Sequence, residues 1–242
     1  MTAIEVKNLS FSYDGVRTVL HDVSFSVSEG EMFVIAGLSG CGKTTLCLLL
    51  CGLIPHSIKG KPEGDIRVLD IDPVRAGLPE TALRAGLVFQ DADSGIICTT
   101  VEDEVAFGPE NLCCPPSEIR RRVDETLAEF GLEEIRRANP SRLSGGLKKL
   151  LTIASVSALA PPILILDEPM SDLDKEGRAL VGSAIDRQRD RGRTVILVEH
   201  DLARVRSADR WLILDNGAVA LYGAPSGSAE QQNLLTRLRL LP

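Results

Sequence analysis

The sequence predicts an α/β fold built from a mixed core sheet, an antiparallel β subdomain and a helical subdomain. Short apolar runs bounded by glycine or polar residues recur along the chain, as expected of buried strands. Residues 4–28 instead alternate apolar with polar residues, which is typical of a half-buried antiparallel sheet. Residues 91–162 have helical character. We therefore expect one domain over residues 1–242, with residues 1–90 and 163–242 forming the core and β subdomain.

Composition narrows the class of protein. Hydrophobic residues make up 44% and charged residues 25% of the chain, as in soluble globular proteins. A net charge of −7 disfavours nonspecific binding to nucleic acid through a basic face. No apolar run is long enough to span a bilayer, and the N-terminus shows no signal pattern, so we expect a cytoplasmic chain. The six cysteines lack metal-ligand spacing, which favours reduced thiols over a metal site.

The first alternating segment predicts a hairpin. Asp14-Gly15 is a favoured two-residue turn between two antiparallel strands. Tyr13 lies at the tip, where an aromatic side chain is poorly buried. Its ring either stacks on a flat purine, as aromatic side chains do on bases, or simply faces solvent in the turn.

The next stretch carries a phosphate-binding pattern. Residues 32–36 are a short apolar run with two β-branched residues, which predicts a buried strand that leads into glycines and then an apolar helix. Glycines let backbone N–H groups surround phosphate oxygens, and the helix N-terminus favours negative charge. Lys43 would reach the β- and γ-phosphates, and the Thr44 hydroxyl would bind Mg²⁺. The full predicted phosphate-binding set is Gly37, Leu38, Ser39, Gly40, Cys41, Gly42, Lys43, Thr44 and Thr45.

Cys41 lies inside this loop at the start of a helix. That position lowers the pKa of a thiol. The sequence therefore predicts that a thiol reagent blocks nucleotide binding through Cys41. The helix itself is expected to stop near Gly52 and Pro55.

Two further strands are expected at residues 65–69 and 87–89. Gln90 follows the second of them, at the kind of strand end where α/β proteins meet ligands, although an exposed loop glutamine is the alternative. Ser117 is expected to cap a helix that stops at Gly131.

Residues 143–146, Leu-Ser-Gly-Gly, open an apolar helix that is expected to run through Ala160. Ser144, Gly145 and Gly146 at a helix N-terminus form a second anion-binding pattern, although the same residues also occur in ordinary linkers.

Two acidic residues follow the apolar run 163–166. Asp167 and Glu168 would be delivered at the C-terminal end of a buried strand, where an Asp can hold Mg²⁺ and a Glu can take a proton from water. Asp174 fits a helix cap better than Asp167 does. A strand at 194–198 ends before His200, which can bond a terminal phosphate. The remainder is expected to be a strand at 211–214, an Asn-Gly turn, a strand at 218–221 and a short tail.

Together these segments resemble the ATPase subunit of ABC transporters over nearly the whole chain. GLSGCGKTT is similar to the Walker A loop, ILILDE to Walker B, LSGG to the signature and SDLD to the D-loop, while Gln90 and His200 match the Q-loop and the switch. The resemblance implies a P-loop NTPase with the ABC ATPase fold, and a head-to-tail dimer. In such a dimer ATP lies between one subunit's Walker A loop and its partner's signature.

The resemblance also assigns roles. Tyr13 aligns with the aromatic residue that stacks on adenine. Thr44, Gln90 and Asp167 would organise Mg²⁺. Glu168 would activate water and His200 would contact the γ-phosphate. The residues that would contribute to nucleotide binding from the signature and the D-loop are Ser144, Gly145, Gly146 and Asp174.

Residues 99–111, TTVEDEVAFGPEN, look like the ATPases of energy-coupling-factor importers for vitamins and transition metals. In those proteins the segment docks an Arg-bearing helix of a transmembrane coupling subunit, which works with a substrate-binding membrane subunit at the cytoplasmic face of the membrane. Glu102, Asp103, Glu104 and Glu110 would supply an acidic surface for arginine. A solvated acidic loop is the alternative.

The sequence departs from the family pattern at three points. Leu147 and Leu150 replace a Gln and an Arg after the signature, Gly95 stands where a second Gln is frequent, and Ser171-Asp172 replaces small D-loop residues. Because the signature acts on the partner's ATP, Leu147 favours a heterodimer with unequal sites over a homodimer. Another class of ABC transporter, a non-transport ABC ATPase and a non-hydrolysing scaffold are the remaining alternatives, and Glu168 argues against the last.

Overall fold

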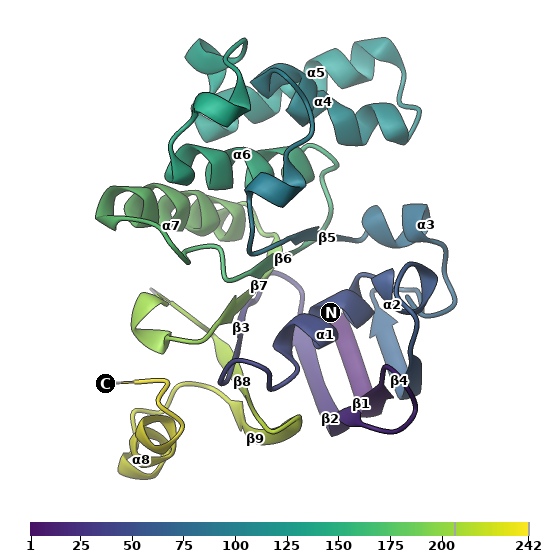
Figure 1. Cartoon of the computed structure of the whole chain (residues 1–242), viewed down its shortest axis with the longest axis vertical. Coiled ribbons are helices and arrows are strands. Elements are labelled where there is room, and N and C mark those ends of the chain that lie inside the picture. The colour runs from purple at the N-terminus through teal and green to yellow at the C-terminus, as the bar shows by residue number, and fades with distance from the viewer. Residues whose placement is uncertain (206, 242) are drawn as a thin grey trace.

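The computed structural model describes residues 1–205 and 207–241. It contains two sheets with helices around and above them (Figure 1). One is a three-stranded antiparallel sheet in the order β2-β1-β4. Its strands are β1 (Thr2–Ser12), β2 (Thr18–Ser28) and β4 (Lys61–Val68). The expected antiparallel subdomain is therefore present.

The hairpin between β1 and β2 differs from its expected form. The connection spans residues 13–17, so it is not a two-residue turn. The Asp14 carboxylate accepts hydrogen bonds from the backbone N–H groups of Val16 at 2.8 Å and Arg17 at 2.9 Å. This side-chain turn replaces the backbone turn that Asp-Gly favours in shorter loops.

The second sheet is the core of the fold. Its six strands have the order β5-β6-β7-β3-β8-β9. The first five strands in this order are parallel, and β9 is antiparallel to β8. The strands are β3 (Met32–Ala36), β5 (Ala85–Val88), β6 (Ile163–Asp167), β7 (Thr194–Glu199), β8 (Arg210–Asp215) and β9 (Ala218–Gly223). Every residue of β3, β6 and β7 is buried, as expected of parallel strands covered on both faces. The predicted mixed core sheet is confirmed.

Two hydrophobic cores lie on opposite faces of this sheet. Alternate residues of β3 divide between them, with Phe33 and Ile35 on the face toward the antiparallel sheet and Val34 on the other. Helix α1 (Lys43–Leu50) contributes to the first core, and α7 (Lys175–Asp190) to the second. The site residues at the ends of the central strands are therefore held by packing from both sides.

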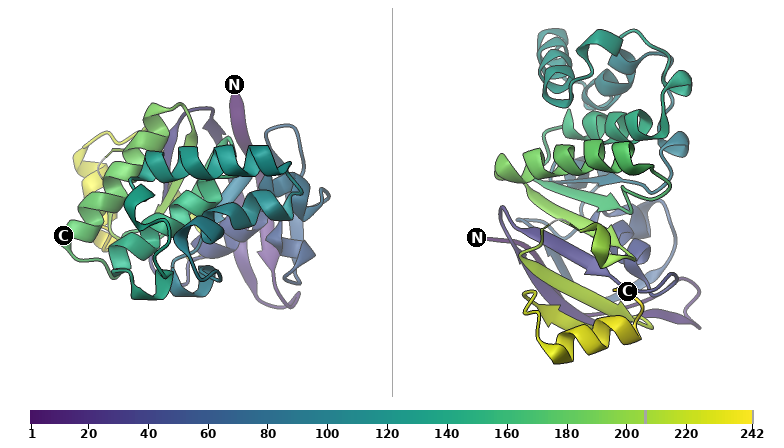
Figure 2. Two further views of the ribbon diagram at one scale, coloured as in Figure 1. Left: turned by 90° about the horizontal axis from the view of Figure 1, so that it is seen from above. Right: turned by 90° about the vertical axis from the view of Figure 1, so that its left-hand side faces the viewer.

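Four of the remaining helices extend the second core. Figures 1 and 2 show α4, α5 and α6 gathered at one end of the molecule, and α8 at the opposite end beside β9. Their bounds are α4 (Val101–Asn111), α5 (Pro116–Phe130), α6 (Gly145–Ser157) and α8 (Ala229–Arg237), and the short helices are α2 (Leu53–His56) and α3 (Leu78–Ala82). Single 3-10 turns are η1 (Asp93–Gly95), η2 (Glu133–Ile135), η3 (Pro140–Arg142) and η4 (Leu202–Arg204).

Three expectations about helices are corrected. Ser117 does not cap α5, because Pro115 occupies the cap and Pro116 begins the helix, where its fixed φ is suited to the first position. The helix after the signature ends at Ser157, before Ala160. The tail contains a helix, α8, capped by Ser228, whose hydroxyl accepts from Gln231 N–H at 3.2 Å. Within the described ranges, no helix combines the length and apolar character needed to cross a bilayer.

Candidate nucleotide-binding and catalytic site

The phosphate loop joins β3 to α1 at the centre of the core sheet. Two of its glycines are required by close contacts: a Cβ on Gly37 would lie 2.3 Å from the carbonyl oxygen of Leu214, and one on Gly42 would lie 2.7 Å from Leu20 Cδ2. Both also have positive φ, 156° and 103°. At Gly40, φ is 82° and no atom lies within 4 Å of the Cβ position. The loop is therefore fixed at its ends and open at its tip, as an anion cradle requires.

The Lys43 side chain folds across this loop. It is only 5% exposed. Its ammonium group donates to the carbonyl oxygens of Gly37 at 2.8 Å and Leu38 at 3.2 Å, and lies 4.0 Å from Glu168 Oε1. The cation is held inside the loop, where it can contact the phosphates of a bound nucleotide.

Asp167 and Thr44 meet beneath the loop. Asp167 ends β6, and its Oδ2 accepts a hydrogen bond from the Thr44 hydroxyl at 2.8 Å. Burial raises the pKa of Asp167, and the bond from Thr44 opposes that shift. A hydroxyl and a carboxylate side by side are hard oxygen donors, which fit Mg²⁺.

Glu168 occupies a strained position. Its φ of 45° lies in the left-handed region that residues other than glycine rarely adopt. Its N–H donates to Val198 O at 3.0 Å, and its carbonyl oxygen accepts from the Ser171 N–H at 3.1 Å and hydroxyl at 2.9 Å. These bonds hold a conformation that costs about 1–3 kcal/mol, as is common at functional sites.

Three strand ends converge on the Glu168 carboxylate. Its Oε2 lies 2.9 Å from His200 Nδ1 and accepts from Gln90 Nε2 at 3.3 Å. Gln90 follows β5, Glu168 follows β6 and His200 follows β7, and these strands are neighbours in the sheet. With Lys43 on the other side, the carboxylate is surrounded by groups that can orient it, as a general base requires.

The predicted adenine-stacking residue lies beside the phosphate loop. The Tyr13 hydroxyl is 2.9 Å from Thr45 Oγ1, and its ring packs edge-on against Phe11 with 4.8 Å between centroids. The ring remains 42% exposed. A cavity of about 580 Å³ joins it to Gly40, Arg17 and Asn216. Sequence reasoning missed Arg17 and Asn216, because loop residues 199 positions apart carry no shared pattern.

The signature residue Ser144 lies at the N-terminus of α6. It caps α6, where its hydroxyl accepts from the Leu147 N–H at 3.4 Å. A separate cavity of about 480 Å³ is lined by the signature and the D-loop residues 172–174, and a Cβ on Gly146 would lie 2.8 Å from Gly177 Cα. Within one chain the signature therefore faces its own D-loop, while the phosphate loop lines the cavity beside Tyr13.

Comparisons with known proteins agree with this arrangement. A match to the ABC transporter family covers residues 20–171, more than half of the chain. The chain belongs to the ABC transporter family. It carries the ATP-binding domain of that family, and the expected ABC ATPase fold is confirmed.

Three known proteins show how similar this ABC ATPase is to others in sequence and in structure. An ABC transporter ATP-binding protein of Methanosarcina mazei is 40% identical to this chain, with 99% of this chain covered. The chain spans only 42% of the length of that protein. The energy-coupling factor transporter ATP-binding protein EcfA of Methanosarcina acetivorans is 35% identical, with 98% of this chain and 83% of that protein covered. The structure of CbiO1 of Clostridium perfringens, part of the ABC transporter complex CbiONQ, has a TM-score of 0.85 at 30% identity and covers 99% and 95% of the two chains.

The D-loop aspartate of this ABC ATPase has a structural role. Asp174 caps α7, and its carboxylate accepts from the Gly177 N–H at 2.7 Å. The capping role that the sequence favours for Asp174 is confirmed, while its contribution to nucleotide binding stays a prediction. Of the departures from the family pattern, Leu150 is 1% exposed and Leu147 packs partly against the second core.

The predicted reactivity of Cys41 in this ABC ATPase is not supported. The thiol is 6% exposed, and burial raises its pKa more strongly than the Lys43 ammonium lowers it. Desolvation disfavours the charged thiolate, and here that effect exceeds the attraction of the helix N-terminus. The expectation of a lowered pKa is therefore wrong.

Two of the acidic residues expected to form a docking surface at 99–111 instead make contacts within the chain. Glu104 is 3% exposed, and its Oε2 accepts from the N–H groups of Ile97 at 3.0 Å and Cys98 at 2.8 Å. Glu102 pairs with Arg136 at 2.9 Å. What this segment offers instead is an apolar groove of about 490 Å³ between α3, α4 and α6, and its lining includes Ile97, Phe107, Val156 and Leu159. The expectation of an acidic docking surface is corrected at these two residues.

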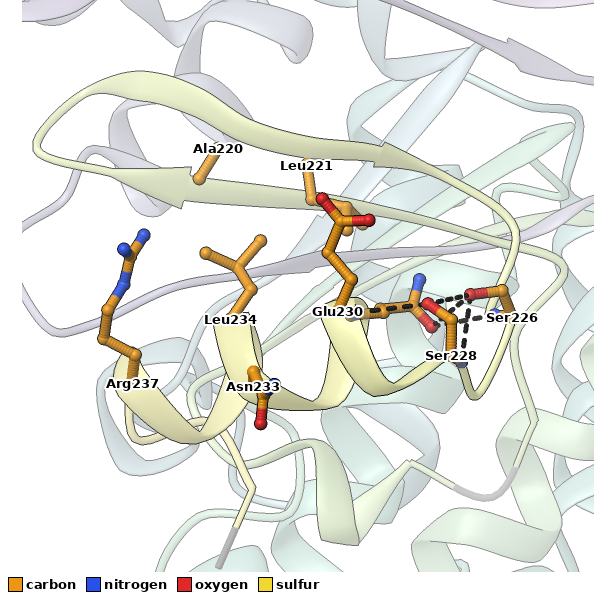
Figure 3. Close-up of a pocket in the computed structure, with 9 residues that line it drawn as sticks. Ala220, Leu221, Ser226, Ser228, Glu230, Asn233, Leu234 and Arg237 are labelled. Atoms are coloured by element: carbon orange, nitrogen blue, oxygen red, sulfur yellow. Dashed lines mark hydrogen bonds between the residues drawn. The ribbon is translucent and has the colours of Figure 1, made fainter.

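A larger cavity of the ABC ATPase lies far from these motifs. It occupies about 740 Å³ between β9 and α8, where Leu221 and Leu234 face each other (Figure 3). One end is closed by hydrogen bonds from Ser226 N–H to Gln231 Oε1 at 2.8 Å and from Gln231 N–H to Ser228 Oγ at 3.2 Å. None of the predicted site residues lines this cavity.

Proposed function

We propose that this chain powers an energy-coupling-factor importer of a vitamin or a transition-metal ion. It would bind ATP between its Walker A loop and the signature of a second ATPase subunit, and closure of that dimer would drive a transmembrane coupling subunit. Support comes from residues 99–111 and from the likeness to EcfA and CbiO1. The chain would then be a peripheral protein at the cytoplasmic face of the membrane.

The chemistry proposed for the site is the hydrolysis of ATP to ADP and phosphate. Lys43 and the loop N–H groups would bind the β- and γ-phosphates, and Tyr13 would stack on the adenine. Glu168 would take the proton from the attacking water. His200, hydrogen-bonded to that carboxylate at 2.9 Å, would contact the γ-phosphate. This assignment depends mainly on one observation: His200 and Gln90, which follow the two strands next to β6, both contact the Glu168 carboxylate.

The oxygen donors of the site fit Mg²⁺. Thr44, Asp167 and Gln90 would hold it, and the first two are in direct contact at 2.8 Å. Bound there, Mg²⁺ would neutralise charge on the β- and γ-phosphates. Asp167 is buried, so it can offer its carboxylate without competing water.

The apolar groove is the proposed docking place for a helix of the coupling subunit. Ile97 is 62% and Phe107 41% exposed, an unusual exposure for two large apolar side chains near each other. Asp103 and Glu110, which remain exposed on α4, could still pair with arginine at the rim. Apolar contact in the groove would supply most of the affinity, and the charges would supply orientation.

The second ATPase is proposed to be an unlike subunit. Ser144, Gly145 and Gly146 of this chain would close the partner's ATP site, and Leu147 replaces the polar residue usual after them. The site on this chain retains Lys43 and the catalytic set described above. A heterodimer with one weaker site follows, and equal full hydrolysis at both sites of a homodimer would contradict it.

Reconstitution tests the proposal. The chain would be co-purified with its membrane partners, and uptake of vitamins and transition-metal ions into vesicles would be measured with and without ATP. Phe107→Asp is expected to abolish co-purification while leaving ATP binding intact. Ile58→Asp is the matched control, because Ile58 is 36% exposed, close to the value for Phe107, and lines neither the groove nor the cavity beside Tyr13. Outward transport, or unchanged assembly of Phe107→Asp, would refute the proposal.

A further inference from the structure

One lysine of the signature helix is buried where no sequence pattern predicted a functional group. Lys149 lies five positions after Ser144 on α6 and is 3% exposed. Its ammonium group donates to the carbonyl oxygen of Phe89 at 3.2 Å and to that of Gln90. These carbonyls follow the last residue of β5, so the signature helix is tied directly to the backbone of the Q-loop.

The contact between α6 and β5 is close along its length. At the other end of α6, a Cβ on Gly86 of β5 would lie 2.4 Å from Val156 Cγ1. Only glycine permits this approach. Val156 of the helix therefore packs directly on the strand, and the Lys149 ammonium binds the carbonyls of the two residues that follow the strand.

Four acidic residues interact electrostatically with the Lys149 ammonium. Asp91 belongs to the Q-loop, Asp167 ends β6, Asp172 lies in the D-loop and Glu199 ends β7. Burial lowers the pKa of Lys149, and the neighbouring acidic groups, Asp91 first, oppose that shift. Lys149 thus interacts with acidic residues of the Q-loop, the D-loop and two strand ends, at a depth where electrostatic interactions are weakly screened.

We propose that Lys149 is a positioning residue, which fixes the Q-loop to the signature helix and so holds the Gln90 amide against the Glu168 carboxylate. The inference rests on the catalytic roles proposed above for Gln90 and Glu168. Gln90 contributes both ends of the link: its carbonyl oxygen accepts from Lys149, and its Nε2 donates to Glu168 at 3.3 Å. A shift of the signature helix on contact with a partner's nucleotide would therefore move Gln90 in the same subunit.

The neighbouring lysine provides a matched control. Lys148 reaches the same loop, but through an ion pair of 2.5 Å with Asp93, whose side chain is 73% exposed. The Asp93 end of this pair is open to solvent, which screens the interaction, although the Lys148 side chain is only 18% exposed. Loss of Lys148 removes a positive charge from the same turn of α6 without freeing the carbonyls of the Q-loop.

The test uses the full-length chain and steady-state ATP hydrolysis. Lys149→Met is expected to lower kcat at least tenfold with KM for ATP changed less than twofold, because the phosphate loop and Tyr13 are untouched. Lys149→Arg, which keeps a charged donor, is expected to recover most of kcat, and Lys148→Met to match the parent. Hydrogen exchange of the backbone amides at 89–93 should accelerate at least tenfold in Lys149→Met alone.

Other results would overturn the inference. These are a kcat within twofold of the parent in Lys149→Met, a rise in KM with kcat unchanged, or a Lys149→Arg variant as slow as Lys149→Met. If Lys149→Met does not fold, Lys149→Gln takes its place, because its amide can still donate to one carbonyl; it must then show partial kcat. A parent chain that neither binds nor hydrolyses ATP would instead refute the proposed function, whatever the variants do.

Discussion

The Glu168 carboxylate and the His200 imidazole lie 2.9 Å apart, between Oε2 and Nδ1, across the ends of two adjacent parallel strands. Asp167 pairs with Val198 in the sheet, so Glu168 and His200 follow the ends of adjacent strands within about one residue of register. The imidazole and the Gln90 amide both approach the same carboxylate oxygen. These two contacts orient the Glu168 carboxylate, which favours catalysis by a positioned base.

Removing the charge of Glu168 should separate hydrolysis from binding. Glu168→Gln keeps the shape of the side chain but cannot accept a proton, so kcat should fall by on the order of 10²-fold or more. Affinity for ATP should stay near the parent value, because Lys43 and the loop are unchanged. Phosphate release and equilibrium binding of a fluorescent ATP analogue measure the two effects. Normal phosphate release in the variant would remove Glu168 from its proposed role.

Lys43 should control affinity. Lys43→Ala removes a cation that is held inside the loop by Gly37 and Leu38 and so lies in place for the phosphates. Charge-assisted hydrogen bonds of this kind contribute enough that affinity should fall about 10- to 100-fold. Titration calorimetry with ATP provides the measurement, and Lys175→Ala at the start of α7 is the control. Unchanged affinity and turnover in Lys43→Ala would contradict the nucleotide-binding assignment itself.

Glu199 should make stability fall as pH rises. Burial raises its pKa from the ordinary value of 4.5 to about 7, with Arg204 opposing the shift and Glu168 and Asp201 adding to it. At pH values between 4.5 and about 7, Glu199 keeps its proton in the folded chain but has released it in the unfolded chain. This contribution to stability is therefore complete below pH 4.5 and is lost as pH rises through about 7.

The variant Glu199→Gln tests that sign. Its free energy of unfolding, measured by urea titration, should exceed that of the parent at pH 8.5 by an amount that shrinks toward pH 5. The pKa difference corresponds to on the order of 3 kcal/mol over the whole interval. A parent chain that becomes more stable relative to the variant as pH rises would show that Glu199 is ionised in the fold.

Thiol reagents should act away from the phosphate loop. Cys113 is exposed at the end of α4, whereas Cys41, Cys47 and Cys51 are buried and burial raises the pKa of each thiol. Mass spectrometry after brief treatment at neutral pH should find Cys113 labelled first and ATP binding retained. Early labelling of Cys41 with loss of binding would restore the expectation drawn from the sequence.

Glu104 should contribute to stability more than to docking charge. Its carboxylate accepts from the backbone N–H groups of Ile97 and Cys98, in the loop before α4, so Glu104→Ala leaves both without that partner. The expected loss is about 2–3 kcal/mol of unfolding free energy. Asp103→Ala, which also removes a carboxylate from the first turn, should cost about 1 kcal/mol. Equal losses in the two variants would mean that the burial of Glu104 has no energetic consequence.

The local elements followed from the sequence because their causes are local. The strand at 32–36, the glycine loop and the helix after it depend on adjacent residues, and the acidic pair after 163–166 follows from a buried strand that ends there. The motifs also predicted the ABC ATPase fold, since their order along the chain is specific. Local rules failed where a competing interaction was not visible, as with the prolines that displaced Ser117 from the cap of α5.

Tertiary structure decided what each charged group does. The same sequence run that suggested an acidic docking surface buries Glu104 and pairs Glu102, because α4 packs against residues that come later in the chain. Burial likewise reversed the expectation for Cys41. Lys149 is the clearest case: nothing in its neighbours along the chain distinguishes it from Lys148, yet packing of α6 on β5 buries one ammonium among carbonyls and leaves the other in a partly exposed ion pair. Sequence determines which chemical groups are present and which elements carry them, whereas solvent exclusion, which sets the strength of charge interactions, exists only once the elements are packed.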